Sequence, residues 1–288
     1  MHYYDYNEPR QHGTINFPIE YYYVDERHPR YLMPYHWHKE YEIIRILKGH
    51  FTITIDGETC SANAGDLIFI NQGLIHGGIP ENCIYECIVF DLQFLLMHGA
   101  AMTQYMTKLT GCSILIQSHF TRCDKDLFAI AAQLFEAVEK KAPAYELNTV
   151  GALYLFLGII FQKNYYTAYT KTTRRNLKEA NHIKPVLEYI ENHYMEKLSQ
   201  AEIADKFYFS KEYFARFFKK HTGMTFIEYL TKYRLQKARM QLMATNSGIL
   251  EIALNNGFSD DRRLILAFKE EYGTTPFQYR KMERNKEE

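Results

Sequence analysis

The sequence predicts a multidomain α+β protein, with an N-terminal β jelly roll or barrel, a helical pair, and an all-α C-terminal domain. Residues 20–91 contain short runs with strand-type alternation, whereas residues 124–163 have helical spacing. Residues 182–281 repeat one pattern twice: a short helix, a tight turn and a second helix ending in Phe-Lys. The predicted division is an N-terminal domain at 1–165, a linker at 166–180 and a C-terminal domain at 181–288.

Composition places this chain among reduced, soluble proteins. A chain of 288 residues with 47% hydrophobic content can bury sizeable cores, which suits two domains. The five cysteines are odd in number and lack a CxxC pair, as expected in a cytosolic protein. The first residues, MHYYDYNEPRQHG, lack a basic patch followed by an apolar core, so we expect no signal peptide. The uncharged residues 147–162 are fewer than the roughly 20 needed to span a bilayer, so we expect a cytoplasmic protein with no membrane partner.

The N-terminal strands are predicted from alternating side chains and from the turn residues between them. Phe51, Ile53 and Ile55 alternate with polar residues, and Asp56-Gly57 then supplies a tight hairpin turn. Several strands at this spacing favour a double-sheet jelly roll or a small barrel over a helical fold. The expected strands are EYYYV, YEIIRIL, FTITID, DLIFIN and IYECIVFD.

Three histidines and a glutamate are the candidate ligand-binding residues of this domain. His36, His38 and Glu42 share parity, so they would project to one face of a single extended strand, and His76 follows in GDLIFINQGLIH. Three imidazoles and a carboxylate can hold a divalent transition metal. The same side chains could instead hydrogen-bond a small molecule, or the first two histidines could lie on the surface of an edge strand. Arg45 has the opposite parity and should face away.

Two apolar helices, at residues 124–141 and 146–163, are predicted to need packing partners. Apolar positions in the first recur at steps of three and four residues. This stripe could contact a second subunit in a twofold dimer, or it could pack within one chain against the second helix and the barrel. The residues selected for a dimer contact are Leu127, Ile130, Leu134, Phe135 and Val138.

The first copy of the C-terminal repeat reads LSQAEIADKFYFSKEYFARFFKKHTG. Ser199 and Glu202 form a capping-box pattern, which should start a helix. Tyr208 and Phe209 make the turn, and Ser210 is placed to cap a second helix. That second helix directs its phenylalanines inward and leaves its charged residues outside, as in a helix-turn-helix motif.

The second copy reads ILEIALNNGFSDDRRLILAFKEEYG. Gly257 suits the left-handed conformation that ends its first helix, and Ser259 can cap its second. Between the copies, Thr225 and Glu228 form a capping box for a helix that can run to about Met243. At about 1.5 Å per residue this connector spans roughly 28 Å. That length is close to the 34 Å or so between successive major-groove faces of B-DNA.

At these residues the sequence resembles the double helix-turn-helix DNA-binding domain of the AraC/XylS family of transcription regulators. The similarity is most specific in GFSDDRRLILAFKEEYGTTPFQYRK. One difference is that the family has a small residue, an aromatic and a polar pair in the second recognition helix, where this chain reads RRLIL. Residues 36–49 and 65–76 resemble the two motifs of the cupin family, although Arg30, Asn71 and Pro80 depart from the family pattern.

Candidate DNA-binding residues come from the resemblance and from helical spacing. Arg216 is the best candidate for reading a base, because an arginine can bond a guanine edge with two hydrogen bonds in the major groove. Arg262 and Arg263 are next, but base reading and phosphate contact require the same residue type. The alternative is that these are surface charges on a small helical domain. The full set is Lys211, Glu212, Ala215, Arg216 and Lys219 with Asp261, Arg262, Arg263, Ile265 and Leu266.

Charge is consistent with a local DNA-binding face. The chain has no net charge, but residues 181–288 hold 18 Lys and Arg against 15 Asp and Glu, a net +3. Binding to phosphates through such a face should weaken as salt rises.

These observations predict a ligand-responsive, sequence-specific transcription regulator and not an enzyme. The resemblance implies double-stranded DNA, a small-molecule effector that is a sugar, a homodimer, and RNA polymerase as a candidate partner. The cofactor is unknown, with a divalent transition metal as the candidate. One alternative is a metal-dependent cupin enzyme, an oxygenase or isomerase, with an autoregulatory DNA-binding domain. Another is a DNA-binding protein whose barrel is only a dimerisation scaffold.

Overall fold

A computed structural model describes residues 12–14, 16–28, 31–93, 100–111, 113–168 and 171–284. The chain divides into two compact units, Met1–Asn181 and His182–Glu288. The residues predicted as a linker, 166–180, contain strand β9 (Tyr166–Ala168) and the first part of helix α4 (Lys171–His193). Within the described ranges, no helix combines the length and apolar character needed to cross a membrane.

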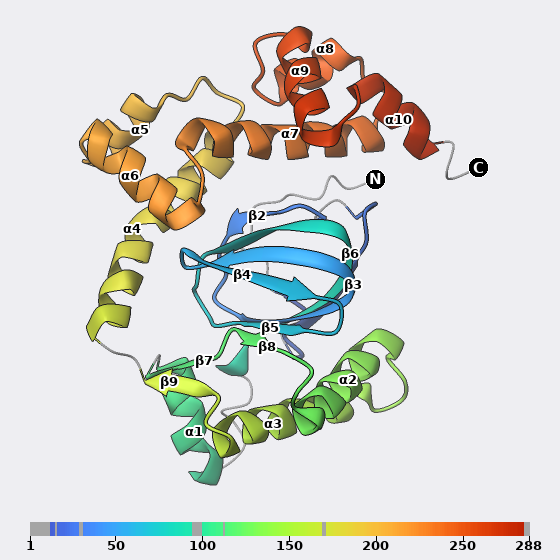
Figure 1. The fold of residues 1–288 in the computed structure, drawn as a ribbon, viewed down its shortest axis with the longest axis vertical. Coiled ribbons are helices and arrows are strands. Elements are labelled where there is room, and N and C mark those ends of the chain that lie inside the picture. Colours follow the sequence, from blue (N-terminus) through green and yellow to red (C-terminus); the bar gives the residue numbers. More distant parts are fainter. Residues whose placement is uncertain are drawn as a thin grey trace. The chain divides into compact units, whose positions relative to one another are not determined.

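The N-terminal unit is built on a seven-stranded antiparallel sheet (Figure 1). The strand order is β1-β6-β3-β5-β8, with β2 paired to β6 and β4 paired to β3. This β-rich unit, followed by an all-helical one, confirms the predicted fold class. The sheet strands are β1 (Ile19–Val24), β2 (Met33–His36), β3 (Tyr41–Ile55), β4 (Glu58–Asn63), β5 (Leu67–Ile70), β6 (His76–Phe90) and β8 (His119–Phe120), and β7 (Ile114–Ile116) pairs separately with β9.

Strand β3 is one long bent strand where the sequence predicted two. Its pairing with β6 shifts register between Ile46 and Lys48 and again before His50. Gly49 lies in this irregular stretch with φ +76°, and a Cβ there would meet the carbonyl oxygen of Asn82 at 2.1 Å. The chain therefore bends at a glycine without ending the strand, and Figure 1 shows the resulting curvature.

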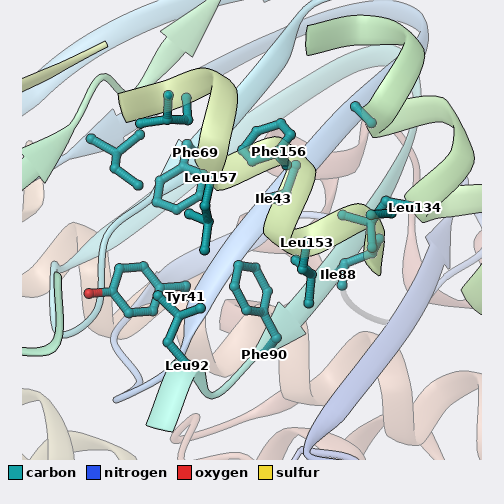
Figure 2. Close-up of a cluster of buried hydrophobic side chains, with 14 of the residues drawn as sticks. Tyr41, Ile43, Phe69, Ile88, Phe90, Leu92, Leu134, Leu153, Phe156 and Leu157 are labelled. Carbon is teal, nitrogen blue, oxygen red and sulfur yellow. The ribbon is translucent and has the colours of Figure 1, made fainter. Parts of the chain in front are cut away.

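Helices α2 (Lys125–Lys140) and α3 (Tyr145–Gln162) cover one face of the curved sheet, and α1 (Ala100–Thr110) lies beside them. The core between them is apolar and aromatic. Figure 2 shows Tyr41, Ile43 and Phe90 of the sheet facing Leu153 and Phe156 of α3. A second buried cluster fills the other side of the sheet, inside the barrel. The observed bounds of α2 and α3 are close to the predicted ones, 124–141 and 146–163.

The residues predicted to form a dimer contact lie in this core. Leu127, Leu134, Phe135 and Val138 are at most 3% exposed, and Ile130 packs against the same cluster. An apolar sheet face needs a cover, and α2 supplies it within the same chain. The prediction that these side chains contact a second subunit is therefore wrong, and the packing within one chain that the sequence left open is what the structure shows.

Asp124 joins the start of α2 to the end of α3. Its side chain caps α2 by accepting a hydrogen bond from the backbone N–H of Leu127, and the Nζ of Lys163 lies 2.7 Å from both carboxylate oxygens. The hydroxyl of Tyr165 donates to the same carboxylate over 2.9 Å. Burial alone would raise the pKa of Asp124, but the hydrogen bonds from Lys163, Leu127 and Tyr165 outweigh it and lower that pKa.

Replacing Asp124 with Ala should destabilise the N-terminal unit by about 2 kcal/mol, since a cap is lost and Lys163 loses its partner. Because the folded-state pKa is lowered, this stabilisation is present above about pH 4 and is lost as pH falls through that pKa. Urea unfolding followed by the fluorescence of Trp37, the one tryptophan of the chain, measures it. Glu136→Ala, on the exposed face of the same helix, is the control; equal midpoints for both variants would contradict the prediction.

The C-terminal unit contains two helix-turn-helix pairs joined by a long helix, as predicted. The capping roles of Ser199, Ser210 and Thr225 are confirmed. The cap predicted at Ser259 is wrong: Asp260 caps instead, because its carboxylate directly precedes the helix and accepts from the backbone of Arg263. The helices are α5 (Gln200–Lys206), α6 (Lys211–Thr222), α7 (Phe226–Ala244), α8 (Ile249–Asn255), α9 (Asp261–Tyr272) and α10 (Pro276–Arg284).

Candidate functional sites

The structure brings the four predicted ligand-binding side chains together. His36 ends β2 and pairs across the sheet with His76, the first residue of β6, and their ring centroids lie 4.2 Å apart. His38 follows β2, with its ring 5.0 Å from that of His76, and Glu42 lies in β3. The expected reason, one extended strand, is wrong, because residues 37–40 are not strand and the chain turns between β2 and β3 there. The four side chains are brought together by strand pairing in the folded sheet, and not by alternation along one strand.

Each of the three imidazoles is oriented by a backbone carbonyl at its Nδ1 atom. The contacts are from His36 to Pro34 at 2.8 Å, from His38 to Glu40 at 3.1 Å, and from His76 to Leu74 at 3.0 Å. A carbonyl oxygen only accepts, so each Nδ1 carries a proton. In the neutral ring this leaves Nε2 with a lone pair. One ring nitrogen from each histidine lies within 4.8 Å of the other two, which is close enough for the three nitrogens to coordinate one ion.

Glu42 places a buried carboxylate beside these rings. Its Oε2 atom is 3.3 Å from Nε2 of His38 and 3.3 Å from Nε2 of His76. The contact with His76 is close enough for charge interaction, but its geometry is not that of a hydrogen bond, so this fully buried Nε2 has no donor or acceptor partner. Burial alone would raise the pKa of Glu42, but His38 and His76 hold that pKa well below its usual range.

An ionised carboxylate facing imidazole nitrogens in a buried site requires a positive charge. Protons on the rings can supply it, and so can a bound cation. Three imidazole nitrogens and a carboxylate are a donor set for a divalent transition metal. Carbonyls that accept from the far ring nitrogens fix the orientation of such ligands, as they do around protein metal sites. The unpartnered, buried Nε2 of His76 is the observation that fits this use best.

His12 is a fourth imidazole near the cluster, and the sequence did not identify it. It is buried, its ring centroid is 5.8 Å from that of His38, and its Nδ1 lies 3.2 Å from the hydroxyl of Tyr22. The next residue, Gly13, donates its backbone N–H to Glu20 over 3.0 Å, which fastens this segment to β1. His12 lies before the first strand and outside both motifs, so no spacing signal pointed to it.

Arg45 faces away from the cluster, as predicted. Its guanidinium bonds the buried carboxylate of Glu86 through Nε at 2.7 Å and lies 4.5 Å from the ring centroid of Phe135 in α2. The hydroxyl of Tyr21 donates to the other oxygen of Glu86 over 2.7 Å. The ion pair of Arg45 and Glu86 therefore joins the sheet to α2, and neither residue belongs to the ligand set.

The two recognition helices, α6 and α9, correspond residue by residue. Each has 12 residues, follows a capping side chain and ends at a left-handed glycine, Gly223 or Gly273. Positions 50 apart therefore match, so that Lys211 begins α6 where Asp261 begins α9. Most of the predicted DNA-binding residues are exposed on these helices, and the others are half-buried. The exposed ones are Lys211, Glu212, Arg216 and Lys219 in α6 and Arg262, Arg263 and Leu266 in α9. The half-buried ones are Ala215 in α6 and Asp261 and Ile265 in α9.

The turn between α5 and α6 contains Tyr208, as predicted, but in a left-handed backbone conformation that the sequence did not indicate. Tyr208 has φ +59° and is 97% exposed, whereas the matching position of the second copy is Gly257, with φ +77°. The left-handed turn predicted at Gly257 is thus confirmed, and the first copy makes the same turn with an aromatic residue. A β-carbon at Gly257 would meet the carbonyl oxygen of Tyr194 at 2.5 Å, which explains glycine there.

Comparison with known proteins agrees with both halves of this description. The model of the AraC-like ligand binding domain matches residues 18–157, and that of a helix-turn-helix domain matches residues 203–282. The chain belongs to the AraC family of transcriptional regulators. This AraC-family chain is similar to the uncharacterized HTH-type transcriptional regulator YdeC of Bacillus subtilis (strain 168). The two are 25% identical over 283 residues, which are 96% of each protein.

Two further comparisons cover different shares of the AraC-family chain. The HTH-type transcriptional activator RhaS of Escherichia fergusonii is 26% identical over 261 residues, which are 89% of this chain and 91% of that protein. A solved C-terminal domain of the two-component response regulator yesN from Fusobacterium nucleatum is 34% identical, with a TM-score of 0.34, and covers 35% of this chain and 98% of that one. The protein is a transcriptional regulator with an AraC-type ligand-binding domain and a helix-turn-helix DNA-binding domain.

Proposed function

We propose that this AraC-family regulator binds its effector at His36, His38, Glu42 and His76 and reads a specific DNA sequence with α6 and α9. The observation that carries the effector site is the convergence of imidazole nitrogens on one buried, ionised carboxylate. A ligand that binds this cluster better in one arrangement of the chain than in another would shift the regulator toward that arrangement.

DNA reading by two helices is supported by their spacing and exposure. The connector α7 has 19 residues, which at about 1.5 Å each gives a length of roughly 28 Å, close to one turn of B-DNA. Selection of duplexes from a random pool by the full-length chain tests this directly. A preferred duplex should emerge and should outcompete random DNA at 150 mM salt or so. If no duplex is preferred, sequence-specific reading is excluded.

Two chemical classes of effector fit the cluster. A divalent transition-metal ion matches the donor set and would supply the positive charge that Glu42 requires. A sugar, the effector that the sequence suggested, would use the same imidazoles and carboxylate to bond its hydroxyl groups. The metal is the better match, because one ring nitrogen from each of the three histidines lies within 4.8 Å of the other two, and the carboxylate of Glu42 beside them has a lowered pKa.

A thermal-shift titration of the full-length protein, purified without chelator, separates these classes. Zn²⁺, Ni²⁺ and Mn²⁺ form one panel and a set of monosaccharides the other; either ligand at 100 times its Kd stabilises the folded state by about 2.7 kcal/mol. Stabilisation by cations alone assigns a metal effector, and stabilisation by sugars alone assigns a carbohydrate. If neither stabilises the protein, the barrel is a scaffold. Metal-dependent turnover of a substrate would favour the cupin-enzyme alternative.

A homodimer is a further part of the proposal, with RNA polymerase as a candidate partner at the promoter. The outward face of α3 is the better candidate for pairing, because Leu147 and Leu155 are exposed there and Gly151 and Gly158 leave room beside them. Replacing Leu155 with Glu should lower the sedimentation coefficient of a dimer to that of a monomer. Leu250→Glu, at an exposed leucine of α8, should leave it unchanged. A dimer that survives Leu155→Glu would place the contact elsewhere.

A further inference from the structure

The centre of the outward face differs between the two recognition helices. In α9, Leu264 and Phe268 are fully buried, and a helix of 3.6 residues per turn places Leu266 opposite the midpoint between them. In α6, Phe214 and Phe218 are likewise buried, and the matching residue opposite them is Arg216. The repeat therefore presents an arginine at the centre of one face and a leucine at the centre of the other.

Leu266 is 70% exposed, and charged residues surround it on the same helix. Arg262, Arg263 and Lys269 are exposed within four residues of it. Single exposed leucines are ordinary on protein surfaces, so exposure alone assigns nothing. The position is informative because it is the one that Arg216 occupies in the first copy, where a residue would reach deepest into a groove.

We propose that Leu266 recognises the 5-methyl group of thymine, so that the two helices read different base chemistry. This inference rests on the proposed DNA-reading function and specifies it. An aliphatic side chain has no donor or acceptor for a base edge, and the thymine methyl is the one apolar group in the major groove. The basic residues around Leu266 would contact phosphates and hold the leucine against the groove floor. The target is then asymmetric, with a guanine-containing segment read by α6 and a thymine read by α9.

The test replaces thymine with deoxyuridine, which removes the methyl group and leaves every hydrogen-bonding atom in place. In the duplex selected by the full-length protein, each thymine is replaced singly and Kd is measured. At one or two thymines, about ten base pairs from the guanines that α6 reads, affinity should fall about fourfold, which is the contribution of one buried carbon group.

Variants of the protein assign that effect to a side chain. With Leu266→Ala, the thymine and deoxyuridine duplexes should bind within about 1.5-fold of each other, because the methyl group no longer has a partner. Leu254→Ala is the matched control, since Leu254 is a 53% exposed leucine on α8, and it should keep the fourfold difference. Both replaced side chains are largely in solvent, so the variants should fold.

Each result decides the matter. A fourfold loss that disappears in Leu266→Ala supports the inference. A preferred duplex in which no deoxyuridine replacement weakens binding overturns it and leaves the proposed function intact, as does a loss that persists in Leu266→Ala. If selection gives no preferred duplex, the proposed function fails, and the assignment of Leu266 fails with it.

Discussion

Replacing His76 with Ala is expected to lower the affinity of the barrel for a divalent transition metal more than about 100-fold. Loss of a residue that only supports a ligand already costs 10- to 100-fold, and His76 would be a direct ligand whose Nε2 has no hydrogen-bond partner. Isothermal titration with Zn²⁺ and elemental analysis of the protein measure affinity and stoichiometry, and neither depends on activity.

The control for His76 is another histidine of the same sheet. His50 lies in β3 and bonds Asn63 at 3.1 Å, away from the cluster, so His50→Ala should keep the full metal affinity. Glu42→Gln keeps the size of the side chain but removes the charge that the cation would neutralise. It should weaken binding less than His76→Ala does. Equal affinities for wild type and His76→Ala would remove the cluster as a metal site and leave hydrogen bonding to an organic effector.

The C-terminal unit was predictable because its determinants are local. Capping boxes, the left-handed glycine and the three- and four-residue spacing each act within a turn or two of helix, so Ser199, Thr225 and Gly257 indicated the helix ends correctly. The cap at Ser259 was wrong for a reason of the same kind. Ser259 and Asp260 are adjacent candidates, and the hydroxyl of Ser259 donates to the carboxylate of Asp260, which is the one that accepts from the helix.

The barrel was less predictable because sheet contacts join residues that are distant in sequence. The four residues of the ligand set were found from their types and motif spacing, yet the expected geometry of one strand was wrong, since His36 and His76 meet across β2 and β6. The buried stripe of α2 illustrates the same limit. Periodicity shows that Leu134 and Phe135 need an apolar partner, but it does not say whether the partner lies in the same chain.

Replacing Arg216 with Ala is expected to reduce discrimination between the selected duplex and random DNA by roughly 10- to 100-fold, the contribution of one bidentate arginine–guanine contact. Arg216 is exposed at the centre of the outward face of α6, and Phe214 and Phe218 hold that helix from the opposite side. The variant should fold, because no buried contact is removed. Gel-shift competition gives the discrimination, and a salt titration gives the number of phosphate contacts.

Arg216→Lys separates base reading from simple charge. Lysine keeps the positive charge but cannot form two parallel hydrogen bonds to the guanine edge, so discrimination should fall while affinity for random DNA and its salt dependence stay unchanged. If Arg216 only contacts a phosphate, the opposite pattern is expected: Arg216→Lys would behave as wild type, and Arg216→Ala would weaken binding to all duplexes equally. The two substitutions together therefore decide whether the centre of α6 reads sequence or supplies charge alone.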